Sequence, residues 1–186
     1  MKRHMISILL LLLFPLNTLF AMNGLTTTRT ATPDERLKAL AITLPDMPAP
    51  VGHYRPYAIA DNMIYISQVA LKNGKILNPG ALKSASDIAR GQEAAQQTIL
   101  NVLAVVKQAC GGTLNCVEQI VRLDGYIAST PQFFDQPKVM DAASNILVDI
   151  FGEKGIHARS AVGATSLPLN SPIEITAMIK LIADHK

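Results

Sequence analysis

The strongest constraint on the fold of this chain is the alternation of apolar and polar residues in its last strand-like segment, residues 173–181. Because successive side chains of a β-strand point to opposite faces of a sheet, one face of this strand is apolar and the other is mostly polar. We therefore predict a sheet whose apolar face is covered by helices and whose other face, which carries Glu174, meets something else. The apolar side carries Ile173, Ile175, Ala177, Ile179 and Leu181, and the opposite side carries Glu174, Thr176, Met178 and Lys180.

Helical periodicity is strongest in residues 86–110, where apolar residues recur at three- and four-residue steps. Gly111 and Gly112 follow and are predicted to end this helix. A shorter helix is predicted over residues 34–44, with Asp34 as its cap. The apolar stripe of the long helix is Ile88, Ala95, Ile99, Val102, Leu103 and Val106.

A second long helix is predicted to begin with Ser129 or Thr130 as its cap. Pro131 would lie in its first turn, where a missing backbone N–H costs nothing, and Gly152 would end it. Its stripe is Val139, Ala142, Ala143, Ile146 and Ile150.

Strand-forming residues fill most of the remaining chain. The predicted order is two strands, a helix, a strand, a helix and two strands, which favours a two-layer α+β domain with a mixed sheet and both helices on one face. An uncovered, half-apolar sheet face usually mediates oligomerisation. The predicted strands are residues 54–60 and 63–71, joined at Asp61-Asn62, then residues 117–128, a run starting near Arg159, and residues 173–181; a loop with Asn73-Gly74 and Pro79-Gly80 follows the first pair.

Residues 1–21 are predicted to be a secretory signal peptide. A positive start from Lys2 to His4 precedes the largely apolar residues 6–14, and the small Ala21 precedes the expected cleavage point. The apolar run is shorter than the about 20 residues of a membrane span. Cleavage would leave a periplasmic or secreted chain without membrane attachment; the alternative is an uncleaved anchor.

The mature chain is predicted to contain one domain. Residues 22–43 are interpreted as a polar leader with a short helix, and residues 44–186 as the domain, a common size for a single core. The chain has 17 Lys and Arg against 14 Asp and Glu, and loss of Lys2 and Arg3 leaves 15 against 14. A nearly balanced charge without basic clusters argues against a nucleic-acid partner.

The two cysteines, Cys110 and Cys116, flank a short loop with two glycines. In an oxidising compartment a disulfide across this loop could form, and the glycines would allow the tight turn. Two free, partly buried thiols are the alternative. No second Cys or His pair lies at ligand spacing, so we predict no metal site.

Arg159 and Glu174 are the residues that suggest chemistry. A guanidinium holds a small carboxylate through two parallel charge-assisted hydrogen bonds, and a strand-held glutamate can handle a proton. The pair predicts a site for a small organic acid. His157 and His53 are interpreted as turn residues. Neither has a serine or cysteine at nucleophile spacing, which argues against a catalytic triad.

The C-terminal tract Ala-Arg-Ser-Ala-Val, Leu-Pro and Ile-Glu-Ile, between residues 158 and 175, resembles the signature of the Rid/YjgF family, the reactive intermediate deaminases also called L-PSP endoribonucleases. Upstream, Pro-Val-Gly-His-Tyr, the strand Met-Ile-Tyr-Ile-Ser-Gln and Asn101 also match. The resemblance covers roughly residues 44–184. Three further motifs resemble a less-characterised subgroup of the family: Gly-Gln-Glu-Ala-Ala, Asp-Gln-Pro-Lys-Val and His-Ala-Arg-Ser-Ala-Val-Gly.

This resemblance implies a chorismate-mutase-like fold and a homotrimer with three clefts between subunits. It implies hydrolysis of 2-aminoacrylate or 2-iminopropanoate, or of 2-iminobutanoate, to a 2-keto acid and ammonia without a cofactor. Arg159 would hold the substrate carboxylate and Glu174 would orient or activate water. Tyr54 and Ser67 would line the cleft, and the backbone N–H at Ala161 would donate a hydrogen bond there.

Two positions depart from the family pattern. The family's Ser-Gly-Gln is Ser67-Gln68 here, which alters how closely the backbone can approach a ligand. A cysteine often found two residues after the arginine is Ala161, which removes any thiol-linked regulation.

Other roles remain open for these residues. Arg159 could pair with Glu153 or Asp149 at the surface, and Glu174 could be a solvated or interface carboxylate. Tyr54 and Ser67 could have a purely structural role in packing and hydrogen bonding. The chain as a whole is either a deaminase or a non-catalytic trimer that binds small carboxylates or ketoacids in the same clefts. The weak charge argues against ribonuclease activity.

Overall fold

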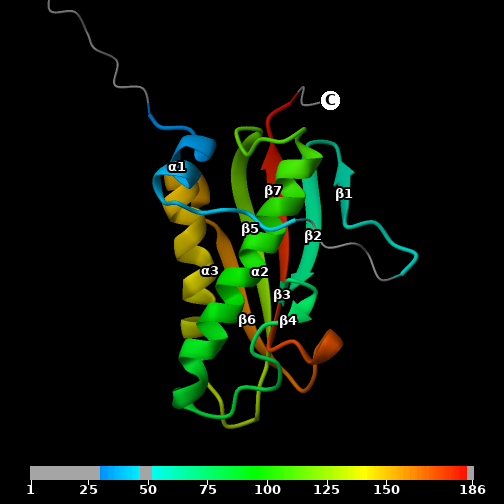
Figure 1. The fold of residues 1–186 in the computed structure, drawn as a ribbon, viewed down its shortest axis with the longest axis vertical. Helices are drawn as coiled ribbons and strands as arrows, with labels where there is room; N and C mark the ends of the chain where they lie inside the picture. The colour runs from blue at the N-terminus through cyan, green and yellow to red at the C-terminus, as the bar shows by residue number, and fades with distance from the viewer. Residues whose placement is uncertain (1–29, 47–51, 184–186) are drawn as a thin grey trace, which may run out of the picture. The chain divides into compact units, whose positions relative to one another are not determined.

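The computed structural model describes residues 30–46 and 52–183, which form a sheet with helices packed on one of its faces (Figure 1). The predicted signal peptide lies outside the described residues. Within the described residues, no helix has the length and apolar character that crossing a membrane would require.

A five-stranded sheet in the order β1-β2-β7-β5-β6 forms one layer of the domain. Neighbouring strands are antiparallel except for β5 and β6, which are parallel, so the sheet is mixed as predicted. Its strands are β1 (Tyr57–Ala60), β2 (Met63–Val69), β5 (Val117–Ala128), β6 (Ala158–Ala164) and β7 (Ile173–Leu181).

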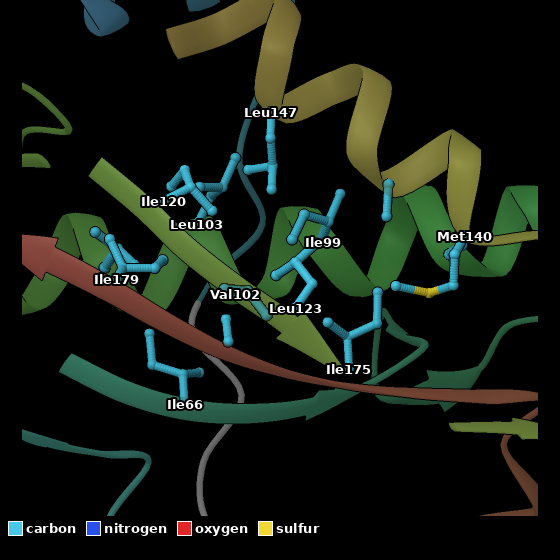
Figure 2. Close-up of a cluster of buried hydrophobic side chains, with 14 of the residues drawn as sticks. Ile66, Ile99, Val102, Leu103, Ile120, Leu123, Met140, Leu147, Ile175 and Ile179 are labelled. Atoms are coloured by element: carbon cyan, nitrogen blue, oxygen red, sulfur yellow. The ribbon is translucent and has the colours of Figure 1, made fainter. Parts of the chain in front are cut away.

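The other layer consists of α2 (Ile88–Ala109) and α3 (Gln136–Phe151), which lie side by side over one face of the sheet (Figure 1). Gly152 ends α3 with a φ of 60°, as predicted for a C-terminal glycine. The two-layer α+β class predicted from the sequence is therefore confirmed. Between the layers, Figure 2 shows the core side chains Ile99, Val102 and Leu103 from α2, Met140 and Leu147 from α3, Ile120 and Leu123 from β5, Ile175 and Ile179 from β7, and Ile66 from β2.

The alternation along β7 has the predicted orientation. Ile173, Ile175, Ala177, Ile179 and Leu181 are buried beneath the helices, whereas the four residues between them are partly exposed on the opposite face. We call this opposite face the open face of the sheet. It also exposes Tyr65 of β2, Tyr126 of β5 and Val162 of β6.

Helix α3 begins at Gln136, not at Ser129 or Thr130 as predicted. The backbone N–H groups of Ser129 and Thr130 donate to the carbonyl oxygens of Ala164 and Leu82, at 2.9 Å each. Ser129 also forms a parallel bridge with Leu82, so the extended pairing continues one residue past β5 and the helix starts later.

The short N-terminal helix is α1 (Pro33–Ala39), and Thr32 rather than Asp34 is its cap. Thr32 and Glu35 form a capping box. The Asp34 carboxylate instead accepts hydrogen bonds from the Thr113 hydroxyl and the Leu114 N–H, at 2.5 and 3.0 Å. Asp34 thus joins α1 to the loop after α2.

Several short elements were not predicted. Strands β3 (Leu71–Lys72) and β4 (Lys75–Ile76) form a hairpin whose turn residues, Asn73 and Gly74, both have positive φ. The remaining short elements are the 3-10 turns η1 (Ala85–Asp87), η2 (Gly152–Gly155) and η3 (Pro168–Asn170).

Cys110 and Cys116 form a disulfide, which is the first of the two alternatives considered from the sequence. The Cys116 side chain is buried, and the loop between the cysteines carries the partners of Asp34. The disulfide therefore fixes the loop that anchors α1.

We expect reduction of this disulfide to lower the free energy of unfolding by about 2 kcal/mol, because it closes a short loop in the unfolded chain. Urea unfolding with and without reductant measures the difference. A Cys110→Ser/Cys116→Ser chain is the control and should not respond to reductant. An identical unfolding midpoint for the wild type in both conditions would contradict the assignment.

Candidate functional site

Glu174 lies on the open face, near the start of β7. The Ser67 hydroxyl, from β2, donates to its Oε1 at 2.6 Å and lies 3.3 Å from the Thr176 hydroxyl. In the sheet register Glu174 is flanked by Val69 on one side and Tyr126 on the other. The structure thus brings together two of the predicted residues, Ser67 and Glu174.

Only one carboxylate oxygen of Glu174 is engaged in this way. Among the described residues, Oε2 has no hydrogen-bond partner, so it is available to a water or a ligand. A carboxylate held at one oxygen and open at the other is suited to orienting a water molecule and accepting its proton.

Tyr54 lies apart from this pair. It is in the segment before β1, which extends away from the sheet (Figure 1), and its side chain is 60 % exposed. Among the described residues its hydroxyl has no hydrogen-bond partner, so Tyr54 joins no site within one chain.

Arg159 lies on the other face of the sheet, toward the helices. Its register partner on β5, Leu123, is fully buried beneath them. Arg159 Nη1 donates to Asp141 Oδ1 at 2.9 Å and to Ser144 Oγ at 3.0 Å, and both acceptors belong to α3. The guanidinium therefore pairs with Asp141, rather than with Glu153 or Asp149.

The remaining edge of the guanidinium is open. Among the described residues, Arg159 Nε and Nη2 have no acceptor, and the Arg159 side chain is 24 % exposed. Nε and Nη2 form one of the two donor pairs with which a guanidinium grips a carboxylate. The structure thus leaves the Nε and Nη2 donor pair of Arg159, an open fork, free to bind a carboxylate ligand.

Ala161 follows on the same side of β6 as Arg159 and packs against the core. Among the strands that the structure describes, β6 pairs only with β5 and is therefore an edge strand of the sheet. The backbone along this edge is open to a ligand or to another chain.

Glu174 and Arg159 do not meet within one chain. Leu123 connects their positions, because it pairs with Arg159 on one side and with Ala177 on the other. Two strand spacings and three residues along β7 separate the two Cα atoms by roughly 14 Å, and the side chains point to opposite faces. A single small acid cannot contact both side chains of one chain.

Small residues bring α3 close to the edge of the sheet. A Cβ at Gly125 of β5 would collide with the Met140 side chain of α3, and a Cβ at Gly155 would collide with the Leu147 backbone oxygen. A larger residue at Gly155 would hold η2 away from α3, because the clash there is with backbone atoms, whereas at Gly125 the flexible Met140 side chain would have to move. The close approach places the α3 acceptors within reach of Arg159.

His157, interpreted from the sequence as a turn residue, belongs to the same cluster. Its Nδ1 lies 2.6 Å from the Gly155 carbonyl oxygen and its Nε2 lies 3.2 Å from Ser144 Oγ. Burial lowers the pKa of His157 below its ordinary value; the hydrogen bond to Gly155 opposes this shift and the Arg159 charge adds to it. Sequence spacing gave no sign of this cluster, because Ser144 lies on a different element.

Among the described residues, no group of three or more His, Cys, Asp or Glu side chains is arranged to hold a metal ion. The described basic residues of the open face have acidic partners. Arg122 Nη2 lies 2.8 Å from Asp124 Oδ1, and Lys180 Nζ lies 2.6 Å from Glu118 Oε1. This pattern leaves no cluster of unpaired cations on that face.

Known proteins resemble this chain over most of its length. The family model described as YjgF/chorismate mutase-like, putative endoribonuclease, matches residues 34–182. Protein TCP17 of Trypanosoma cruzi is 34% identical over 148 residues, which are 78% of this chain and 91% of that protein.

Two solved structures are also similar. One is the protein Atu1372, with unknown function, from Agrobacterium tumefaciens, which is 38% identical, with a TM-score of 0.74 over 81% of this chain and 92% of that one. The other is a putative endoribonuclease from Shewanella oneidensis, 35% identical, with a TM-score of 0.76 over 81% of this chain and all of that one.

The lowered pKa of His157 predicts how the stability of the fold depends on pH. Because the folded chain binds a proton at His157 less readily than the unfolded chain does, stability rises with pH in the window below the ordinary value of 6.5 and is lost as pH falls through it. We expect His157→Gln to flatten this dependence, as measured by urea midpoints across the window. His53→Gln, at an exposed histidine, is the control and should keep the wild-type slope. Equal slopes for wild type and His157→Gln would contradict the burial of the imidazole.

Proposed function

The chain belongs to the YjgF/chorismate mutase-like, putative endoribonuclease family, and on that premise we propose that it hydrolyses reactive enamine and imine intermediates to 2-keto acids and ammonia. The substrates would be of the 2-aminoacrylate/2-iminopropanoate type, including 2-iminobutanoate. The observation that carries the proposal is the Arg159 guanidinium, pinned at Nη1 and open at Nε and Nη2.

The open fork fits the one charge that all these substrates share, their carboxylate. Two parallel N–H···O bonds from one guanidinium fix the plane of a carboxylate as well as its position. The reacting carbon is bonded directly to the carboxylate carbon. Arg159 would therefore place the imine carbon within narrow limits, and such positioning supplies much of the rate of a reaction with an electrophilic substrate.

Glu174 would act on the water. Its open Oε2 would take a proton from water as the water oxygen bonds to the imine carbon, and the C=N double bond would become a single bond. That proton would pass to nitrogen and give the neutral carbinolamine, C(OH)–NH2. Glu174 Oε2 would then take the hydroxyl proton and deliver it to the nitrogen, so that the C–N bond breaks with ammonia as the leaving group and the C=O bond of the ketone forms. Ser67 would hold Oε1 throughout, at the 2.6 Å seen in the structure.

The opposite-face placement of the two residues supports a cleft shared between subunits. Arg159 and the backbone of Ala161 would come from one subunit, and Ser67 and Glu174 from the open face of its neighbour. A homotrimer would cover the three open faces and create three such clefts. Tyr54, on its extended segment, would line the cleft.

The signal peptide, if cleaved as predicted, would place this activity in the periplasm or outside the cell. Export favours the alternative, a trimer that binds small carboxylates or ketoacids without turnover, because reactive enamines of amino-acid metabolism arise in the cytosol. Ribonuclease activity has little support, since the open face pairs its described basic residues with acids.

Substitution of Arg159 tests whether this residue binds the substrate or only forms a surface ion pair with Asp141. Imines are generated in situ by an amino-acid oxidase, and ketoacid release is followed with purified mature protein. We expect Arg159→Ala to lower kcat/KM about 30- to 150-fold, mainly through KM, because hydrogen bonds to a charged group contribute about 2–3 kcal/mol. Unchanged kinetics would remove Arg159 from the site.

Substitution of Glu174 separates the enzyme from the binding trimer. Glu174→Gln should lower kcat by about 10²- to 10⁴-fold with little change in KM, the usual contribution of a general acid–base group. Glu118→Gln, a carboxylate paired with Lys180, is the matched control and should turn over normally. Binding of 2-ketoacids without acceleration by any chain, wild type included, would favour the binding trimer.

A further inference from the structure

We infer that Ser144 and His157 are positioning residues that orient the Arg159 guanidinium for its carboxylate ligand. The inference rests on the proposed function, in which Arg159 binds that carboxylate. It assigns to two residues, one on α3 and one beside η2, a role in holding Arg159 rather than in contacting the ligand.

The direction of each hydrogen bond follows from its partner. The Gly155 carbonyl can only accept, so His157 Nδ1 carries a hydrogen and donates across the 2.6 Å contact. The neutral ring, which the lowered pKa of His157 favours near neutral pH, then has a bare lone pair on Nε2. Ser144 Oγ, 3.2 Å away, donates its only hydrogen to Nε2.

This arrangement determines what Ser144 offers to Arg159. With its hydrogen committed to His157, the Ser144 oxygen presents lone pairs toward Arg159 Nη1, 3.0 Å away. Gly155 thus sets the orientation of the His157 imidazole, and the imidazole sets that of the Ser144 hydroxyl. The hydroxyl in turn holds one end of the Arg159 guanidinium. The chain of bonds runs in one direction, Arg159 to Ser144 to His157 to Gly155.

The second acceptor of Nη1 cannot supply this orientation alone. Asp141 is 54 % exposed, and an exposed ion pair contributes little and is easily exchanged for water. Ser144 and His157 are both partly buried. Asp141 provides opposite charge beside Arg159, whereas Ser144 provides a fixed direction. A guanidinium held from one side presents the same open edge, Nε and Nη2, to each ligand.

The test measures the affinity of 2-oxobutanoate by isothermal titration calorimetry on the mature oligomer. Ser144→Ala removes the acceptor and should raise Kd about fivefold to tenfold, less than Arg159→Ala does, because the serine bonds to the guanidinium and not to the ligand. Ser144→Thr keeps the hydroxyl and should restore Kd to within about twofold. Ser160→Ala is the matched control, because this serine donates to Asp124 on the open face.

The contribution of His157 is tested in parallel. His157→Leu removes the acceptor and should weaken binding as Ser144→Ala does, whereas His157→Gln offers an amide oxygen and should bind more tightly than His157→Leu. Because both residues act through one guanidinium, the double variant Ser144→Ala/His157→Leu should bind no more weakly than either single variant. Thermal unfolding of each variant confirms that it is folded.

Three results would overturn the inference: an unchanged Kd for Ser144→Ala, a loss in Ser144→Thr as large as in Ser144→Ala, or losses that multiply in the double variant. Arg159→Met separates this failure from failure of the proposed function. If Arg159→Met binds as the wild type does, the carboxylate role of Arg159 is wrong and the positioning role falls with it. If Arg159→Met loses affinity while Ser144→Ala does not, only the positioning role is wrong.

Discussion

Helices α2 and α3 bury the apolar side chains of β5 and β7 on one face of the sheet, and this packing decides on which face every other side chain of these strands lies. Four large side chains and one alanine of β7 are buried in this way. A one-residue slip of β7 would expose them, at a cost of about 8 kcal/mol or more, which is comparable to the whole stability of a small domain. Glu174 therefore cannot leave the open face without unfolding the sheet.

The same packing directs Arg159 toward the helices. Its neighbour Leu123 is buried beneath them, and glycines at positions 125 and 155 let α3 and η2 approach closely. The arginine consequently meets α3, where two acceptors hold one end of its guanidinium. A residue that could have been a mobile surface cation is instead held with one edge free. The proposed chemistry depends on this difference.

The periodic elements were predictable because their signals are local. Strand β5 occupies the predicted residues 117–128, and the helix after it ends at Gly152 as predicted. The β3–β4 hairpin was missed because its strands have two residues each, too few to show a period, although Asn73-Gly74 marks its turn. The start of α3 was placed too early because the bonds that hold Ser129 and Thr130 come from distant residues.

The candidate site was only partly predictable. Residue chemistry singled out Arg159 and Glu174, and the pair was predicted to form one site for a small organic acid. In the sheet β5 lies between β6 and β7, and the order of strands is a property of the whole core rather than of either segment. The contacts of Ser144 and His157 with Arg159 likewise depend on how closely α3 approaches the edge strand, which no local pattern records.

The shared cleft is tested most directly by mixing subunits that carry different lesions. Arg159→Ala and Glu174→Ala chains are unfolded together and refolded at equal concentration, and imine hydrolysis is measured well below the wild-type KM, where each variant alone has little activity. If one subunit supplies the arginine and its neighbour the glutamate, random assembly restores intact clefts at about a quarter of the wild-type number, with activity to match. If the mixed oligomers form and remain inactive, the two residues do not act together across a subunit boundary, and the account is wrong at its centre.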